Sequence, residues 1–271
     1  MKTSALVLPE PNFVIRYDLR DTGRSTTCEP GTASYTLRGF ANDALGVLDA
    51  FGLKKAHFVG FSLGGGPVGA YRDEPDLLPM SEEHLSKFVA LPPPNWSNIE
   101  EAVSFLVQHA ELCASSSHGF DEAIETTRAS RVFGRSTKLS SMFNHSAIAH
   151  TRWTRERLGE ITVPTLVIHE DEDCVIPYPH GVALSKEVPN AELLTMEQTG
   201  HEIPRRFGTL LFLQLSVIRK VGDFFTVQKG QKAVSPQFQI ASWLVFIYRL
   251  SVSNPFPRYP HPPGGQTLAN A

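Results

Sequence analysis

The sequence contains few cysteines. Only three, Cys28, Cys113 and Cys174, occur in 271 residues, and they lie far apart. Their number is odd, and their spacing matches neither a metal-binding pair nor a disulfide framework. Disulfides persist mainly in oxidising compartments, so this cysteine usage favours a reducing one, and we expect a cytoplasmic protein.

The sequence also lacks an excess of charge of either sign. Its 25 basic side chains nearly balance 28 acidic ones, which leaves a formal net charge of -3. Proteins that bind nucleic acids carry a basic excess or a basic stripe. We therefore expect no nucleic-acid partner.

Long hydrophobic runs are missing as well. The apolar patch from Ala5 to Leu8 is too short for the core of a signal peptide. The longest apolar stretch, residues 241–248, ends at Arg249. That is well short of the roughly 20 residues that a membrane-spanning helix needs, so we expect no stable membrane insertion.

The first part of the chain alternates between strand and helix patterns. Residues 13–17 are β-branched and aromatic, which predicts a strand. Apolar residues recur at helical spacing from Leu37 to Phe51, and Gly52 stands where a helix would end. Residues 56–61 predict a buried strand. This order of strand, helix and strand is typical of a parallel sheet covered by helices.

Residues 75–160 contain no convincing strand and predict a helical cap. Ser97 and Glu100 have the spacing of a capping box at the start of one helix. Asp121 is expected to cap a second helix that runs through Phe133.

The strand pattern resumes after the cap. It predicts a strand over residues 162–168, a helix over 181–186 and a strand over 191–196. The composition after about Phe207 no longer shows this rhythm, and its end is rich in proline and glycine. The expected organisation is an α/β core in two parts, 1–74 and 161–206, a helical cap at 75–160, and a divergent, partly disordered tail at 207–271.

One motif carries the chemistry. Residues 60–64 read Gly-Phe-Ser-Leu-Gly, which is the G-x-S-x-G pattern of a nucleophile elbow, and they follow directly on a predicted strand. The glycines allow a tight turn in which Ser62 adopts strained backbone angles and its hydroxyl stands clear of the sheet. The alternative interpretation is a glycine-rich turn with an incidental serine.

A serine nucleophile needs a base, and the base needs an acid that orients it. After an elbow serine the chain order is acid and then histidine. His201 follows a predicted strand, and Asp173 lies in the loop after the preceding strand. Both stand at the carboxyl ends of strands, where open α/β sheets place their sites.

Other residues compete for these two roles. Glu170, Asp171 and Glu172 are alternative acids, and His180 is a weak alternative base. The remaining histidines fit less well: His57 is expected in the core and His169 in a structural role. Five are expected to face solvent from the cap: His84, His109, His118, His145 and His150.

Several segments together resemble the α/β-hydrolase superfamily, over about residues 13 to 206. They are Asp21-Thr22-Gly23-Arg24-Ser25, Gly60-Phe61-Ser62-Leu63-Gly64, Asp173-Cys174-Val175-Ile176-Pro177 and Gly200-His201-Glu202-Ile203-Pro204. The branch that looks most similar is the aclacinomycin methylesterase-like hydrolases.

The resemblance implies an α/β-hydrolase fold with a mostly parallel sheet, and hydrolysis of methyl or lipid-type carboxylic esters. It implies Ser62 as nucleophile, His201 as base and Asp173 as acid, the last from its spacing to Pro177. The backbone N–H of Leu63 would be one oxyanion donor. No metal or organic cofactor is implied, and the partner would be a small-molecule ester.

The sequence departs from that branch in ways that predict an incomplete sheet. Only twelve residues precede Phe13, and Gly65-Gly66-Pro67 follows the elbow where the branch has a helix. Two alternatives therefore remain open: a catalytically weak or inactive remnant, and an amidase similar to proline iminopeptidases.

Overall fold

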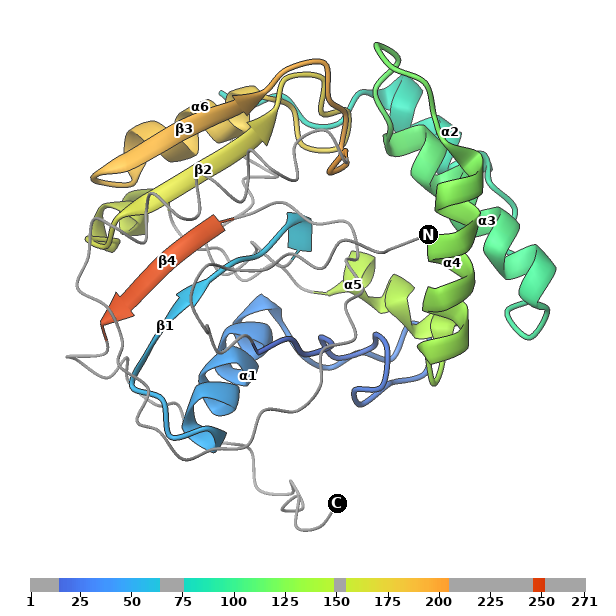
Figure 1. Cartoon of the computed structure of the whole chain (residues 1–271), viewed down its shortest axis with the longest axis horizontal. Coiled ribbons are helices and arrows are strands. Elements are labelled where there is room, and N and C mark those ends of the chain that lie inside the picture. Colours follow the sequence, from blue (N-terminus) through green and yellow to red (C-terminus); the bar gives the residue numbers. More distant parts are fainter. Residues whose placement is uncertain (1–14, 64–75, 149–154, 205–245, 252–271) are drawn as a thin grey trace, which may run out of the picture.

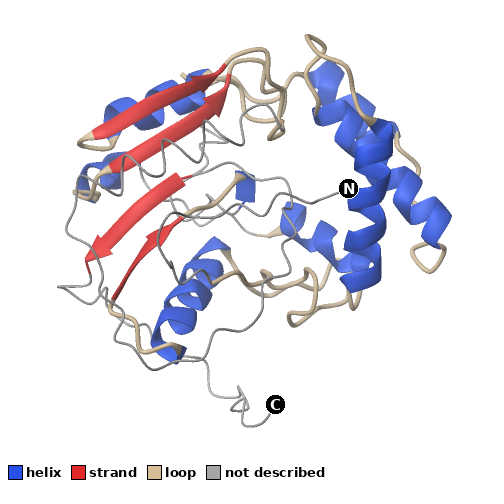
Figure 2. Cartoon of the chain, in the orientation of Figure 1, coloured by secondary structure: helices blue, strands red, loops and turns tan. Residues whose placement is uncertain are grey.

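The computed structural model describes residues 15–63, 76–148, 155–204 and 246–251. A sheet with its helices occupies one side of the molecule, and a group of helices occupies the other (Figures 1 and 2). In chain order the elements are α1 (Leu37–Ala50), β1 (Lys55–Phe58), α2 (Glu82–Ala90), α3 (Ile99–Cys113), α4 (Glu122–Arg135), η2 (Leu139–Phe143), α5 (Asn144–Ala147), η3 (Arg155–Glu160), β2 (Thr165–Glu170), α6 (Pro179–Glu187), β3 (Ala191–Met196) and β4 (Phe246–Ser251).

The four described strands form a sheet in the order β1-β4-β2-β3. β2 and β3 pair in parallel, and β4 is antiparallel to both β1 and β2. β1, β2 and β3 therefore run in the same direction, which agrees with the expected mostly parallel sheet. Their carboxyl ends meet at one edge, as a site built on strand ends requires.

β4 differs from the sequence prediction, which assigns residues 246–251 to the divergent tail. These residues lie between β1 and β2 in the sheet instead. Their apolar and aromatic character, Phe-Ile-Tyr at the start, suits a strand paired on both sides. A long-range pairing of this kind leaves no local sequence signal.

The predicted strand at residues 13–17 is wrong in its described part. Residues 15–19 have no regular secondary structure and do not belong to a strand. An apolar pattern alone is not enough, because a strand forms only where its backbone groups pair with another strand. Residues 13 and 14 lie outside the described ranges. Leu19 packs instead on a small apolar cluster with Leu37 and Phe40 of α1.

The helix predicted at Leu37 to Phe51 is confirmed as α1. Gly52 has φ +65, the left-handed conformation that ends helices and suits glycine. The main core lies around the sheet, where α6 packs against β2 and β3, and η3 packs against α6. Its buried members are Phe61, Leu77, Leu158, Val167, Ala183, Leu184 and Val188.

The elements within residues 76–148 are helices joined by loops, and this segment contains no strand, as predicted for the cap. Asp121 caps α4 by accepting a hydrogen bond from the N–H of Ile124 at 3.0 Å. The N-cap of α3 lies one residue later than the predicted capping box places it. Asn98, not Ser97, caps α3, because its side-chain oxygen accepts from the N–H groups of Glu100 and Glu101.

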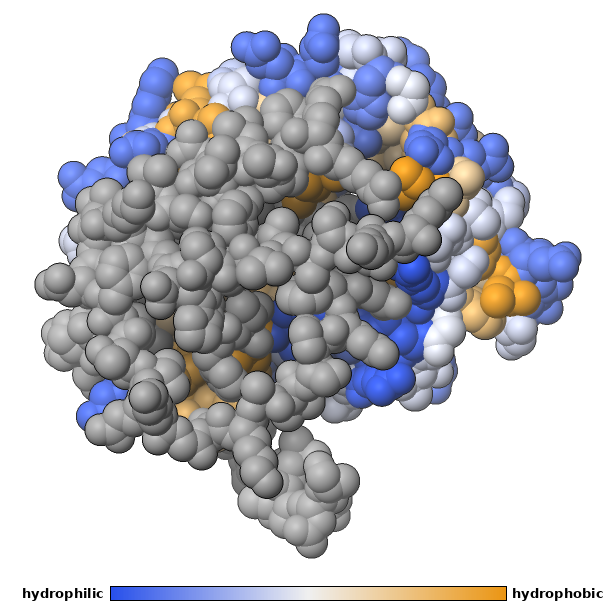
Figure 3. Space-filling view, viewed as in Figure 1, coloured by the Kyte–Doolittle hydropathy of each residue, from blue (hydrophilic) through white to orange (hydrophobic). Residues whose placement is uncertain are grey.

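The outer surface of this helical layer carries exposed apolar side chains. Val89 is 76% exposed, and Leu85 and Ile99 are about half exposed. In Figure 3 a small hydrophobic patch surrounded by hydrophilic surface lies on the right, where these helices are. In the described part of the chain, no helix is both long enough and apolar enough to cross a membrane.

Candidate active site

The elbow has the strained geometry that its sequence predicts. β1 ends at Phe58, three residues earlier than expected, and the chain then turns. Ser62 has φ +48, a left-handed conformation that a residue with a side chain rarely adopts. Strain of this kind persists only where the surrounding structure imposes it, and it is typical of functional sites.

Asp173 lies in the loop after β2, and its carboxylate is fully engaged. One oxygen, Oδ1, accepts the backbone N–H groups of Val175 and Ile176 at 2.8 and 2.7 Å. The other, Oδ2, lies 2.8 Å from Nδ1 of His201. Burial works to raise the pKa of Asp173, but the hydrogen bond and charge of His201, with the Ile176 N–H, outweigh it and hold the pKa below its usual value.

His201 lies in the loop after β3 and joins the other two residues. Its Nε2 is 3.0 Å from Oγ of Ser62, and its Nδ1 faces Asp173. The ring also stacks on Phe61, with ring centroids 4.7 Å apart and 26° between the planes. The structure thus brings together Ser62, His201 and Asp173, from three separate loops.

Phe61 is a site residue that the sequence analysis does not single out. It occupies a variable position of the G-x-S-x-G motif, so the pattern gives it no role. In the structure it is 3% exposed and belongs to the main core. It anchors the elbow in the core while its face supports the His201 ring.

Two of the three rival acids make hydrogen bonds elsewhere, and the third is buried. Asp171 accepts the N–H of Thr199 at 3.3 Å. Glu172 accepts the hydroxyls of Ser115 and Ser117. Glu170 is completely buried at the end of β2, and neither of its oxygens has a hydrogen-bond partner among the described residues. Burial raises the pKa of Glu170 well above its usual value, and the charge of Asp173 adds to the effect.

The rival bases are bound to backbone carbonyls. Nε2 of His180 lies 2.8 Å from the Leu78 oxygen, and Nε2 of His169 lies 2.8 Å from the Ile176 oxygen. His169 therefore supports the acid loop, in keeping with a structural role. His57 lies within β1, and His150 is outside the described residues.

The prediction that the cap histidines face solvent is wrong for the four that the structure describes. All are partly buried: His84, His109, His118 and His145. His84 and His145 bind the backbone oxygens of Leu112 and Arg20. Burial, aided by the charge of His201, lowers the pKa of His109. Sequence position within the cap does not reveal such packing.

One group of side chains has the composition of a metal site. His169, Glu170 and Asp173 offer ligand atoms within 4.8 Å of one another. However, Asp173 already binds His201 and two backbone N–H groups, and Nε2 of His169 binds Ile176. A cation here would have to break the contacts that orient the base. These three residues are therefore better suited to holding His201 in place than to binding a metal ion.

The turn at residues 21–25 is held by Asp21, which is fully buried. Its carboxylate accepts from the Tyr35 hydroxyl, the Cys28 N–H and the Asn144 amide. Burial opposes these donors, yet they lower the pKa of Asp21 below its usual value. Gly23 is required in this turn, because a Cβ there would lie 2.2 Å from the Asp18 carboxylate.

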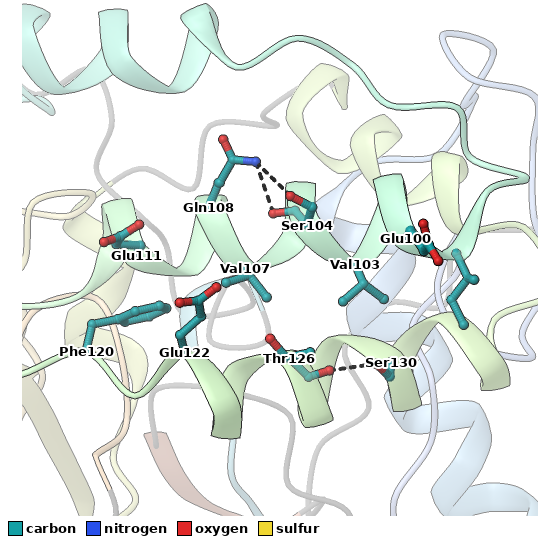
Figure 4. Close-up of a pocket in the computed structure, with 11 residues that line it drawn as sticks. Glu100, Val103, Ser104, Val107, Gln108, Glu111, Phe120, Glu122, Thr126 and Ser130 are labelled. Atoms are coloured by element: carbon teal, nitrogen blue, oxygen red, sulfur yellow. Dashed lines mark hydrogen bonds between the residues drawn. The ribbon is translucent and has the colours of Figure 1, made fainter.

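A cavity of about 560 Å³ lies in the helical layer, between α3 and α4 (Figure 4). Val103 and Val107 of α3 form part of its wall, together with Phe120, and acidic residues stand at both ends of it. All of its lining residues belong to 99–130, so the triad does not line it. At Ser62, His201 and Asp173, by contrast, three functional groups converge with hydrogen-bond geometry.

Two family models match the chain. One, described as the alpha/beta hydrolase fold, matches residues 12–109, and one described as TAP-like protein matches residues 137–206. A rhodomycin D methylesterase of Streptomyces peucetius is 29% identical over 228 residues, covering 71% of this chain and 76% of the methylesterase. Its counterpart from Streptomyces sp. strain C5 has the same identity and coverage.

Solved structures share the fold. An enol-lactonase from Burkholderia xenovorans has a TM-score of 0.55 at 20% identity, with 76% of this chain and 80% of the other covered. A bromoperoxidase from Bacillus anthracis has a TM-score of 0.54 at 20% identity, covering 75% and 80%. The family models, the relatives and the solved structures point to the same fold, and the chain is a hydrolase with the α/β-hydrolase fold.

Proposed function

We propose that the chain hydrolyses carboxylic esters, with Ser62 as nucleophile, His201 as general base and Asp173 as the acid that orients it. The observation that carries this proposal is the continuous path of contacts from Ser62 Oγ through the imidazole to Asp173, with distances of 3.0 and 2.8 Å. Both are within hydrogen-bond reach, and the first allows His201 to take the Ser62 proton directly.

The geometry also supports the tautomer that the proposed reaction needs. Asp173 carries a lowered pKa and is ionised at neutral pH, so it accepts a hydrogen bond from the N–H at Nδ1 of His201. The lone pair of Nε2 then faces the Ser62 hydroxyl. Proton transfer to Nε2 as Oγ attacks the ester carbonyl leaves an imidazolium that Asp173 stabilises.

The remaining steps follow the same contacts. The tetrahedral intermediate expels the alcohol, which takes the proton from Nε2, and Ser62 is left acylated. Water then attacks the acyl-enzyme with His201 again as base, releasing the acid and restoring Ser62. We assign one oxyanion donor to the backbone N–H of Leu63, which follows the nucleophile.

Methyl esters are the substrate class that we favour. The supporting observation is the similarity over 228 residues to two rhodomycin D methylesterases. The fold likeness to the enol-lactonase adds nothing on substrate, since at 20% identity it concerns the fold alone.

The test uses matched ester and amide substrates with the same acyl group. We expect the purified protein to release alcohol from methyl and p-nitrophenyl esters and to hydrolyse the matching anilides far more slowly. Faster cleavage of the amide would favour a peptidase-like function. Ester turnover that is equal in the parent and in Ser62→Ala would contradict the proposed mechanism.

A further inference from the structure

The loop between α3 and α4 contacts both catalytic loops through one buried residue. Glu172 immediately precedes Asp173, and Glu202 immediately follows His201. Ser115, which is 6% exposed, donates its hydroxyl to Glu172 and its backbone N–H to Oε1 of Glu202 at 2.9 Å. A single cap residue therefore bridges the neighbours of the acid and the base.

Two further side chains of the loop reinforce this bridge. Ser117 donates its hydroxyl to the second oxygen of Glu172 and its N–H to Oγ of Ser115 at 2.8 Å. Nε2 of His118 lies 2.7 Å from Oε1 of Glu202. The hydroxyls of Ser115 and Ser117 lower the pKa of Glu172, which keeps this acceptor ionised. Hydrogen bonds to an ionised acceptor are stronger than those between neutral groups.

The backbone of the base loop also rests directly on the end of α3. A Cβ at Gly200 would lie 2.4 Å from the Cys113 carbonyl oxygen and 2.6 Å from the Ser115 nitrogen. On the acid side, Sγ of Cys174 lies 3.4 Å from the Leu112 oxygen. The cap thus touches residues on both sides of the Asp173–His201 pair.

We propose that Ser115, Ser117 and His118 are positioning residues that hold the acid and base loops at the separation in which His201 can take the Ser62 proton. The proposal rests on the proposed function of the triad. These residues act through Glu172 and Glu202. Reaction rates depend steeply on such placement, and a shift of about 1 Å costs on the order of a hundredfold.

The primary test compares Ser115→Ala with Ser116→Ala. Ser116 is exposed, lies in the same loop and makes no side-chain hydrogen bond to the described residues. We expect Ser115→Ala to lower kcat for a p-nitrophenyl ester about tenfold or more, with KM nearly unchanged, because the loss is one of geometry. Ser116→Ala should match the parent.

Two other variants guard against misfolding and test the mechanism of positioning. Ser117→Ala removes an exposed hydroxyl and should lower kcat less than Ser115→Ala does. Glu202→Ala should lower kcat, and Glu202→Gln, which keeps an acceptor oxygen, should recover most of it. Parent-like kcat in Ser115→Ala and Ser117→Ala, with both proteins folded, would overturn the proposal.

A double-mutant cycle separates positioning from general stability. Where Asp173→Asn has already disrupted the acid–base pair, Ser115→Ala should lower the rate of fluorophosphonate labelling little further. A full multiplicative loss would contradict positioning through this pair. If Ser62→Ala is inactive but Ser115→Ala equals the parent, only the positioning proposal fails. If Ser62→Ala retains full activity, the proposed function fails and positioning of the triad fails with it.

Discussion

The acid and base loops are held in place differently from the nucleophile elbow. Asp173 and His201 follow β2 and β3, which pair in parallel along six residues, and their loops are joined by a 3.0 Å bond from the Glu172 N–H to the Thr199 oxygen. Ser62 follows β1, which is separated from β2 by β4.

This difference indicates where the site is robust and where it is sensitive. The acid and base loops are fixed by several hydrogen bonds, so we expect the loss of any one outside the triad to lower the rate without abolishing it. The elbow depends on its strained turn and on Phe61, which joins it to the core and to His201. The predictions below test this contrast, from the largest expected effect to the smallest.

Ser62→Ala should abolish the reaction that the triad performs. Because triad members act as a unit, we expect kcat to fall by about a millionfold, provided that the parent rate is high enough to measure such a loss. Steady-state hydrolysis of a p-nitrophenyl ester measures it, with the exposed Ser34→Ala as control. A pure Ser62→Ala sample with substantial activity would contradict the assignment of the nucleophile.

Asp173→Asn should lower kcat by about ten-thousandfold, because an amide cannot hold the imidazole in the required tautomer. Asp171→Asn and Glu172→Gln alter neighbouring carboxylates that do not contact His201, and they should cost far less. The same ester assay ranks the three variants. Equal losses in Glu172→Gln and Asp173→Asn would show that the acid is misplaced.

Gly200→Ala should destabilise the protein, because its Cβ would meet backbone atoms of Cys113 and Ser115 that have little room to move. Overpacking of this kind typically costs about 1–3 kcal/mol. Gly134→Ala in α4 is the matched control, since nothing lies within 4 Å of its Cβ position, and it should stabilise by up to about 1 kcal/mol. Urea unfolding of both variants measures these changes. A Gly200→Ala variant as stable as the parent would show that the α3 contact is loose.

Glu170→Gln tests the buried carboxyl at the end of β2. Folding raises the pKa of Glu170, so the native state holds this proton more tightly than the unfolded chain. The stability from this group is complete below the unfolded pKa and falls as pH rises above it, by up to about 1.4 kcal/mol per pH unit. Glutamine cannot ionise, so in Glu170→Gln this fall in stability with rising pH should disappear.

Urea unfolding from about pH 4 to about pH 8 checks the effect of Glu170. The free energy of unfolding of Glu170→Gln, relative to the parent, should increase with pH. A difference that is constant across this range would mean that Glu170 ionises normally in the folded protein.

Sequence patterns predicted the features that depend on local chemistry. The elbow at Ser62, the acid–base order and the helix at Leu37–Ala50 all follow from spacing and residue type. The family resemblance placed the acid at Asp173, where residue patterns alone left four carboxylates open. The structure brings that carboxylate to His201.

Features that depend on long-range packing could not be read from the sequence. β4 pairs with β1 and β2, which are distant in the chain, and no local sequence pattern predicts which strands will pair. The described cap histidines are partly buried by tertiary contacts. Because histidine is polar, its residue type alone predicts exposure instead. The Ser115 contacts join residues 57 and 87 positions apart, so no local sequence pattern predicts them. The expected domain boundaries and the cytoplasmic location stay predictions.

The most direct test of the account is the rate at which a fluorophosphonate probe labels Ser62, measured by mass spectrometry of the modified peptide. The account predicts a single adduct at Ser62 in the parent protein. Labelling should be much slower in Asp173→Asn and in His201→Ala, and close to the parent rate in Asp171→Asn. An unlabelled Ser62 in folded protein, or labelling that is equally fast without His201, would contradict an activated serine at this site.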